Sequence, residues 1–125
     1  MDVEGEEPNL RAPASYYLHR GGRLWVTPDV SGMAATRPRT GAEWEVCRMY
    51  VHPDRHGTGL GHALLDVVES HAAGQGAVRL VLWTDTRFER AHCFYEKRGY
   101  RRLGEPRALH DKSGTLEYFY AKPLP

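Results

Sequence analysis

Cysteine, excess charge of one sign and long apolar runs are all scarce in this sequence. Its 125 residues include two cysteines, and the formal net charge is +1. A nearly neutral chain lacks the signature of polyanion binding, so we expect no nucleic-acid partner. No apolar run approaches the length of a membrane span, and the acidic start lacks a signal-peptide pattern. We therefore expect a cytoplasmic protein that contacts no membrane.

The two cysteines, Cys47 and Cys93, fall in apolar patterns, one in an expected strand and one in an expected helix. This placement predicts buried free thiols in a reducing compartment rather than a disulfide framework. Seven histidines are present, but no pair has metal-ligand spacing with a carboxylate partner. We expect no metal, and we place His62, His71 and His92 at the surface or at an edge of the fold.

The chain is long enough for one domain with its own core. Residues 1–14 are acidic and contain proline, so we expect them to be disordered or loosely packed before a single domain over 15–125. Hydrophobic periodicity predicts helices over 58–73 and 87–98. The expected strands cover 23–28, 30–36, 43–51, 77–84, 100–104 and 115–122. This order predicts an α/β fold with a mixed, mostly antiparallel sheet flanked by helices.

The most informative segment joins the strand that ends at Val51 to the helix that follows. Its loop carries three alternating glycines, Gly57, Gly59 and Gly61. Glycines leave the backbone bare, so its N–H groups can turn toward a ligand, and the helix directs its positive dipole end to the same place. This strand–glycine–helix junction predicts a phosphate-binding site.

The surroundings of this loop exclude two phosphate-binding folds. A dinucleotide fold places its glycines directly after the strand, whereas residues 52–56 intervene here. Asp85 stands where an acidic ribose ligand would, but a hairpin precedes the motif and the remaining chain is too short for a dinucleotide crevice. A P-loop requires Gly-Lys-Ser/Thr, which is absent.

Segment 51–65 resembles motif A of the GNAT superfamily of N-acetyltransferases, whose loop holds the pyrophosphate of acetyl-CoA. The family pattern is Arg/Gln-x-x-Gly-x-Gly/Ala, and Gly59 and Gly61 match its two small residues. His56 stands where Arg or Gln is usual. A histidine donates to phosphate conditionally on its charge, and the neighbouring Arg55 is the candidate for a permanent positive charge.

A second match lies downstream, over 91–100. Ala91, Tyr95 and Gly99 agree with the family signature Ala-x-x-x-Tyr-x-x-x-Gly-Phe, and Tyr100 takes the place of its Phe. With the flanking strands, the resemblance covers residues 23–122 and implies a GNAT-like sheet.

Two departures from the family pattern concern the substrates. Phe88 replaces a common Asn that binds the pantetheine arm, a contact left to Arg87 or to a backbone group. The part before Arg23 also has no room for most of the usual N-terminal strand–helix unit, which forms a lip over the acceptor. We therefore expect an acceptor pocket that is incomplete or is finished by another subunit.

Acetyl transfer from a thioester to an amine needs a base for the amine, donors for the oxyanion and an acid for the departing thiolate. The resemblance implies that Glu45 is the base, directly or through water, with Glu43 and His52 as alternatives. It implies that Tyr95 is the acid. A phenol with a pKa near 10 stays protonated at neutral pH, as that role requires.

The resemblance also implies a set of acetyl-CoA contacts. In the family, the strand ending at Val51 splays from its neighbour, which frees the N–H groups of Met49 and Val51 for the pantetheine and the thioester carbonyl. The expected cofactor-binding residues are Met49, Tyr50, Val51, His56, Gly57, Thr58, Gly59, Leu60, Gly61 and His62. Strand alternation puts Glu43, Glu45, Cys47, Met49 and Val51 on one face, unless a bulge intervenes.

These features predict an acetyl-CoA-dependent N-acetyltransferase in which a primary amine, from a small molecule or a peptide, attacks directly in a ternary complex. A substituted-enzyme route would need a well-placed nucleophilic cysteine, which the pattern does not provide. The last third of the chain carries a dense set of polar residues. We expect some of them to form a solvated face and the others to select a charged or hydroxylated amine. The set is Asp85, Arg87, Glu89, Arg107, Asp111 and Glu117.

The alternative function is a non-catalytic acyl-CoA-binding or regulatory subunit of the same fold. The missing lip and His56 both favour that alternative. We also expect a homodimer, because a second copy would bury the exposed sheet and complete the cleft.

Overall fold

The computed structural model describes residues 21–125, which form one six-stranded sheet with two α-helices. In sheet order the strands are β1 (Arg23–Val26), β2 (Gly32–Pro38), β3 (Glu43–Val51), β4 (Arg79–Asp85), β6 (Leu116–Pro123) and β5 (Arg101–Ala108). The helices are α2 (Leu60–Gly74) and α3 (Glu89–Lys97), and the 3-10 turn η2 (Pro53–Arg55) precedes α2. The segment predicted to be loosely packed, 1–14, and the expected gap in the N-terminal unit lie outside the described residues.

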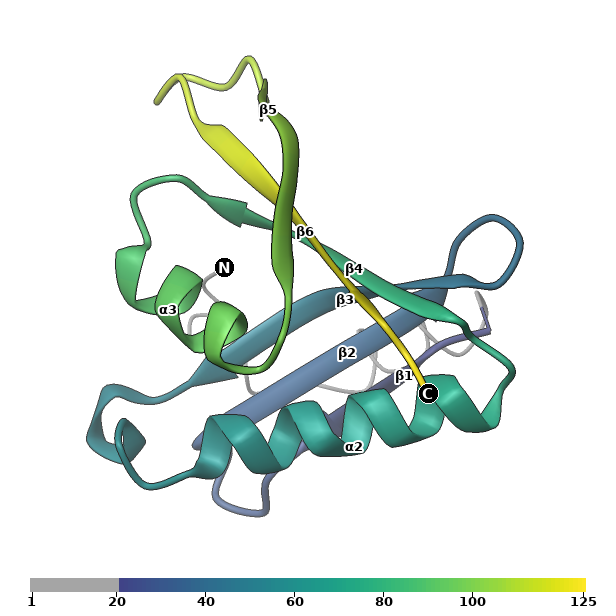
Figure 1. The fold of residues 1–125 in the computed structure, drawn as a ribbon. Helices are drawn as coiled ribbons and strands as arrows, with labels where there is room; N and C mark the ends of the chain where they lie inside the picture. The colour runs from purple at the N-terminus through teal and green to yellow at the C-terminus, as the bar shows by residue number, and fades with distance from the viewer. Residues whose placement is uncertain (1–20) are drawn as a thin grey trace.

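The mixed, mostly antiparallel sheet predicted from the sequence is confirmed. Within residues 21–125, only the β3–β4 pair is parallel, and the other neighbouring strands are antiparallel. The crossover between the parallel strands is α2, which covers one face of the sheet (Figure 1). None of the helices in this range is long and apolar enough to cross a membrane.

β5 extends beyond the strand predicted at 100–104 and ends at Ala108. Its register with β6 shifts: Leu103 pairs with Phe119, whereas Arg107 pairs with Glu117. Gly104 lies in this bulge with a left-handed φ of 71°. The strand therefore continues past its proline, which an edge strand with a bulge accommodates.

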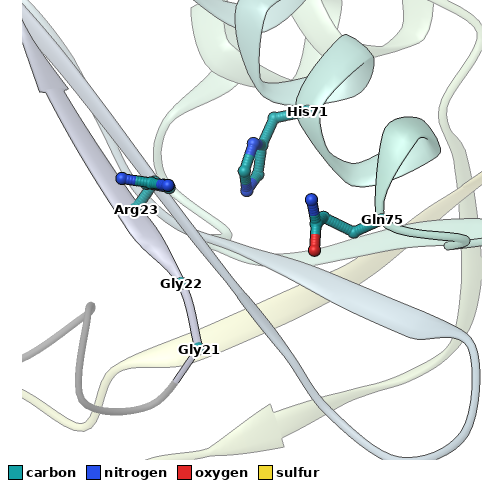
Figure 2. A pocket seen from close by; sticks show the side chains of 5 residues that line it. All are labelled: Gly21, Gly22, Arg23, His71 and Gln75. Atoms are coloured by element: carbon teal, nitrogen blue, oxygen red, sulfur yellow. The ribbon is translucent and has the colours of Figure 1, made fainter.

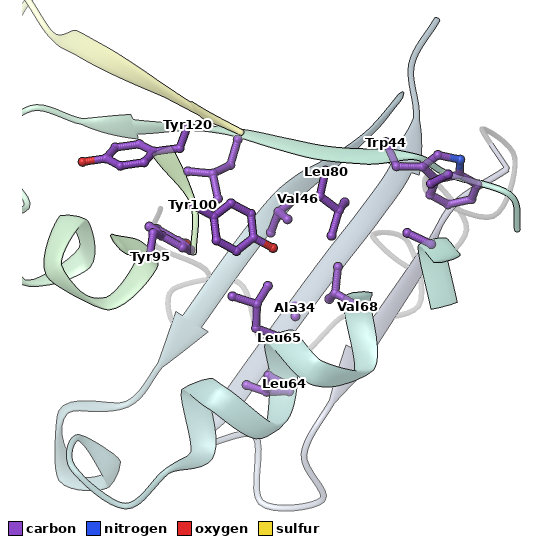
Figure 3. Close-up of a cluster of buried hydrophobic side chains, with 13 residues drawn as sticks. Ala34, Trp44, Val46, Leu64, Leu65, Val68, Leu80, Tyr95, Tyr100 and Tyr120 are labelled. Carbon is purple, nitrogen blue, oxygen red and sulfur yellow. The ribbon is translucent and has the colours of Figure 1, made fainter. Parts of the chain in front are cut away.

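The core lies between α2 and the sheet (Figure 3). α2 buries Leu64, Leu65, Val68 and Ala72, which recur at helical spacing on one face. They pack in one cluster with residues of the sheet and of α3, including Ala34, Trp44, Val46, Leu80, Leu82, Tyr95, Tyr100 and Tyr120. This packing fixes the start of α2, and with it the glycine loop.

β3 and β4 diverge after a short paired stretch. The paired residues are Glu43 with Arg79, Trp44 with Leu80 and Glu45 with Val81. β3 then continues to Val51 and β4 to Asp85 without further pairing between them. Figure 1 shows α3 beside the diverging strand ends. The second half of β3 therefore has one edge that no described strand covers.

Candidate active site

A β-bulge interrupts β3 at the point where the strands diverge. Ala35 of β2 pairs with Arg48, but Thr36 pairs with Val46, so Cys47 is the extra residue. One extra residue reverses the side-chain alternation that follows it.

The bulge separates side chains that simple alternation would put on one face. Trp44 and Val46 lie in the core before the bulge, and Met49 and Val51 pack against the same core after it. Glu45 lies between Trp44 and Val46 in sequence and so points to the opposite face of the sheet. Without a bulge, Glu45 would share a face with Met49 and Val51. With the bulge it does not, and the Glu45 carboxylate is on the other side of β3 from Met49 and Val51.

The backbone of β3 directs two N–H groups to the uncovered edge. The N–H of His52 donates to the carbonyl of Ser31, on the β2 side, at 2.7 Å. Because successive N–H groups of a strand point to opposite sides, those of Met49 and Val51 point away from β2, into the gap between β3 and β4. The backbone of Tyr50 points toward β2 instead. The structure thus brings two of the three predicted strand contacts to the opening.

The glycine loop leaves several donors open at the start of α2. Gly57 and Gly59 have left-handed φ values of 82° and 88°, and an added Cβ on either would meet no atom of residues 21–125 within 4 Å. The N-cap residue of α2 is Gly59, which has no side chain to cap the helix, and the first backbone bond runs from the N–H of Ala63 to the carbonyl of Gly59 at 3.0 Å. Within residues 21–125, the N–H groups of Gly57, Gly59, Gly61 and His62 have no hydrogen-bond partner. Unpaired donors at a helix start form an anion-binding site.

Two side chains of the loop region, those of Thr58 and Arg55, bind other groups of the protein. The Thr58 hydroxyl donates to the carbonyl of Arg55 at 2.5 Å and accepts a long bond of 3.4 Å from the N–H of Leu60. Arg55 forms an ion pair with Asp29, Nη2 to Oδ2, at 2.5 Å. The residue considered as the permanent charge of the loop is therefore already paired.

His56 bridges β3 and α3, and its partner on α3 was not predicted. Its Nε2 lies 3.0 Å from the carbonyl oxygen of Val51, and its Nδ1 lies 2.7 Å from Nη1 of Arg90. The sequence held one clue to this contact, the spacing of Arg90 and Phe94. Residues i and i+4 lie on the same face of a helix, so these two side chains share a face of α3. Phe94 packs so closely on Gly61 that an added Cβ there would lie 3.3 Å from its ring.

Tyr95 lies in the core cluster at the inner face of α3. It is 7% exposed, and its ring centroid lies 5.3 Å from that of Phe94 and 5.8 Å from that of Tyr100. Burial raises the pKa of Tyr95 above the ordinary tyrosine value. The hydroxyl therefore stays protonated at neutral pH and is available as a donor.

Glu45 occupies the apex of the split, because its pairing with Val81 is the last one between β3 and β4. Its side chain is 17% exposed, and Arg37 Nη2 lies 3.6 Å from Oε1. This ion pair of Glu45 is longer than either of the two ion pairs of Glu43.

The two alternatives to Glu45 have closer partners. Glu43 accepts a hydrogen bond of 2.9 Å from Nε of Arg79 in a second ion pair along the strand. His52 Nδ1 accepts from the N–H of Asp54 at 3.0 Å and caps η2. Both side chains have structural roles that a proton acceptor would have to give up.

The cysteines differ from the buried pair predicted. Cys47 is half-buried at the bulge, where burial, reinforced by the nearby Glu45 carboxylate, raises the pKa of its thiol to about 12. Cys93 is exposed, so its predicted burial is wrong. The reason is that α3 is short and buries only the side of His92 and Tyr95. The raised pKa makes the Cys47 thiol a poor nucleophile.

For the direct acetyl transfer that the sequence predicts, we expect the variant Cys47→Ala/Cys93→Ala to keep kcat within about twofold, because that route needs no thiol. Initial rates with saturating acetyl-CoA measure this, and mass spectrometry of the wild type under turnover should find no acetylated cysteine. A loss above about tenfold together with an acetyl-enzyme would contradict direct attack.

The histidines also depart in part from their predicted surface positions. His62 is exposed as expected, but His92 is only 6% exposed, and its Nε2 donates to the carbonyl of Asp85 at 2.9 Å. The prediction for His92 is wrong because a backbone carbonyl satisfies the ring inside the aromatic cluster. His71 is half-buried between Trp25 and Trp44, and burial lowers its pKa. Within residues 21–125, no cluster of three or more potential metal ligands is present.

Most of the predicted polar set gathers around the ends of β4 and β6. Arg87 Nη2 pairs with Asp85 Oδ2 at 2.6 Å, and Arg107 pairs with Glu117 at 2.8 Å. Asp85 and Glu117 are neighbours in the β4–β6 register. Hydrogen bonds from Arg87, first from its side chain and then from its backbone N–H, lower the pKa of Asp85 to about 2. These groups are charged and mutually paired.

A separate shallow pocket of 190 Å³ lies at the other end of α2 (Figure 2). Gly21, Gly22 and Arg23 line it at the start of β1, and His71 and Gln75 line it at the end of α2. A helix of 15 residues separates it from the glycine loop, a length of about 22 Å at 1.5 Å per residue. It is therefore not part of the opening between β3 and β4.

Comparison with solved structures gives the same architecture at low sequence identity. Nourseothricin acetyltransferase superposes with a TM-score of 0.76 at 23% identity, over 83% of this chain and 66% of that one. A GNAT-family acetyltransferase from Staphylococcus aureus Mu50 gives 0.78 at 22% identity, over 97% and 79%. An aminoglycoside 6′-N-acetyltransferase complexed with coenzyme A gives 0.77 at 19% identity, over 98% and 87%. At these identities the likeness establishes the fold.

Sequence comparison points the same way. An uncharacterized N-acetyltransferase of Mycobacterium bovis is 39% identical over 57 residues, and its counterpart in Mycobacterium tuberculosis matches equally. The match covers 46% of this chain and spans 36% of the length of those relatives. The family model of the acetyltransferase (GNAT) domain matches residues 16–102, which is most of the chain. The chain therefore belongs to the GNAT superfamily of acetyltransferases.

Proposed function

We propose that this chain transfers an acetyl group from acetyl-CoA to a primary amine by direct attack in a ternary complex. The observation that carries the proposal is the split between β3 and β4. Its uncovered edge presents the N–H groups of Met49 and Val51, and the glycine loop with its open donors begins a few residues beyond. The complex of a similar fold with coenzyme A supports the choice of donor.

In the proposed reaction, the amine nitrogen attacks the thioester carbonyl carbon and forms the C–N bond. The carbonyl electrons move to the oxygen, which the N–H groups at the β3 edge stabilise. Glu45 accepts the proton of the amine, directly or through water. Collapse of the intermediate breaks the C–S bond, and Tyr95 donates a proton to the departing sulfur. The products are the acetamide and CoA.

The protonation states of the site support direct attack. The raised pKa of the Cys47 thiol, about 12, keeps it uncharged beside Glu45, so it is a poor nucleophile. Burial keeps Tyr95 protonated and therefore able to donate.

A cytoplasmic location belongs to the same proposal, because the reaction consumes acetyl-CoA. A homodimer belongs to it as well, because β5 is an edge strand of the sheet formed by residues 21–125. All eight residues of β5 are exposed. A second copy that covered this edge would satisfy its unpaired backbone groups.

Release of CoA thiol from acetyl-CoA, measured with a panel of amines, tests the proposed function. The panel should include peptides with free N-termini, lysine peptides, polyamines, amino acids and aminoglycosides. We expect amine-dependent thiol release with at least one class and a product heavier by one acetyl group. Binding of CoA without turnover on any amine would support the non-catalytic subunit instead, and absence of CoA binding would contradict both functions.

A further inference from the structure

Both ring nitrogens of His56 are used inside the protein. Nε2 faces the carbonyl oxygen of Val51 at 3.0 Å, and Nδ1 faces Nη1 of Arg90 at 2.7 Å. A carbonyl only accepts and a guanidinium only donates, so Nε2 carries the hydrogen and Nδ1 offers its lone pair. His56 in this arrangement is a neutral ring with no donor left for a phosphate.

Arg90 reaches the glycine loop from α3. Phe94, one turn further along the same helix face, packs against Gly61, and its ring centroid lies 4.7 Å from that of His62. The face of α3 that carries Arg90 therefore covers the start of α2. The contact with His56 sets the guanidinium beside the loop whose N–H groups have no partner.

Arg90 also differs from the other arginines near the start of α2. Arg55 is paired with Asp29 at 2.5 Å, and Arg98 is paired with Asp66 at 2.7 Å. Among residues 21–125, Arg90 has no carboxylate within ion-pair distance and is exposed. A guanidinium has five N–H donors, and the bond to His56 uses one of them. The remaining donors and the positive charge are uncompensated.

We propose that Arg90 is the cation that binds the pyrophosphate of the acyl-CoA donor, and that His56 is a positioning residue that holds it there. The inference rests on the proposed function, because it assumes that the loop receives CoA. His56 links Arg90 on α3 to the backbone of β3. Groups from both elements would therefore lie beside the bound phosphates. Arginine suits this role because its planar donor set matches phosphate oxygens in a bidentate way.

Calorimetric titration of CoA and of 3′-dephospho-CoA into Arg90→Ala tests the role of Arg90. We expect Kd to rise roughly tenfold or more for both ligands, since 3′-dephospho-CoA keeps the pyrophosphate. Lys97→Ala is the matched control, because it removes one positive charge from the same helix two turns away, and its Kd should stay within about twofold. The KM for acetyl-CoA should rise in Arg90→Ala together with Kd.

His56 variants separate positioning from direct binding. His56→Ala alone should weaken CoA binding. In the Arg90→Ala background it should cause no further loss of affinity, because both changes remove the same interaction. His56→Asn should restore part of the affinity, since its amide oxygen lies near the position of Nδ1 and can accept from Arg90. The unfolding temperature of each variant, measured beside the wild type, shows that the fold is kept.

Three results would overturn the inference while leaving the proposed function intact. The first is CoA binding by Arg90→Ala as tight as by Lys97→Ala. The second is a loss for CoA but not for 3′-dephospho-CoA, which would assign Arg90 to the 3′-phosphate. The third is an equal effect of His56→Ala with and without Arg90, which would make His56 an independent ligand. Failure of the wild type to bind CoA would instead overturn the proposed function.

Discussion

Tyr95→Phe should lower kcat roughly a hundredfold and leave KM for acetyl-CoA within about twofold. The change deletes one hydroxyl from a side chain that is 7% exposed, and it leaves the ring contacts with Phe94 and Tyr100 in place. The departing thiolate would lose its proton donor, whereas the binding surface for acetyl-CoA would remain. Steady-state rates at saturating amine, with acetyl-CoA varied, measure both constants.

Tyr100→Phe is the matched control for this experiment. It also deletes a buried hydroxyl from the same aromatic cluster, but that hydroxyl donates to Oε2 of Glu69 at 2.8 Å. We expect a loss of stability of about 1 kcal/mol with kcat close to that of the wild type. An unchanged kcat in Tyr95→Phe, or an equal fall in both variants, would show that Tyr95 is a packing residue only.

Glu45→Gln should lower kcat/KM for the amine roughly a hundredfold at pH 7. The amide cannot accept the proton that the amine loses, although its shape fits the space beside Arg37. The deficit should shrink as the pH rises, because a growing fraction of the amine is then already neutral. A pH series of kcat/KM for the wild type and the variant measures this convergence.

Glu43→Gln controls for the loss of a carboxylate on the same face of β3. Its partner Arg79 makes Glu43 part of a structural ion pair, so we expect lower stability with a pH profile like that of the wild type. A deficit in Glu45→Gln that stays constant with pH, or that Glu43→Gln shares, would remove Glu45 from the role of base.

The junction of β3, the glycine loop and α2 could be predicted because independent local signals agree there. The apolar strand ends at Val51, the glycines follow, and Leu64, Leu65 and Val68 then recur at helical spacing. The bulge at Cys47 could not be predicted, since one extra residue leaves no mark in composition and depends on which residues of β2 lie opposite.

Contacts between residues that are far apart in the sequence could not be predicted for a similar reason. Arg90 and His56 are 34 positions apart and meet only because α3 packs on the start of α2. His92 has a polar side chain that favours the surface, yet the carbonyl of Asp85 satisfies it in the interior. In each case tertiary packing decides the environment of a side chain whose local pattern is uninformative.

Hydrogen exchange of the backbone amides, followed by NMR with and without CoA, tests the central claim most directly. The claim is that the β3 edge and the glycine loop bind the donor through their N–H groups. CoA should slow exchange, or shift the resonances, of the amides of Met49, Val51, Gly57, Gly59, Gly61 and His62. It should leave those of Gly22 and Arg23, at the pocket beyond the far end of α2, unchanged. Changes at that pocket, with no change at the loop, would contradict the claim.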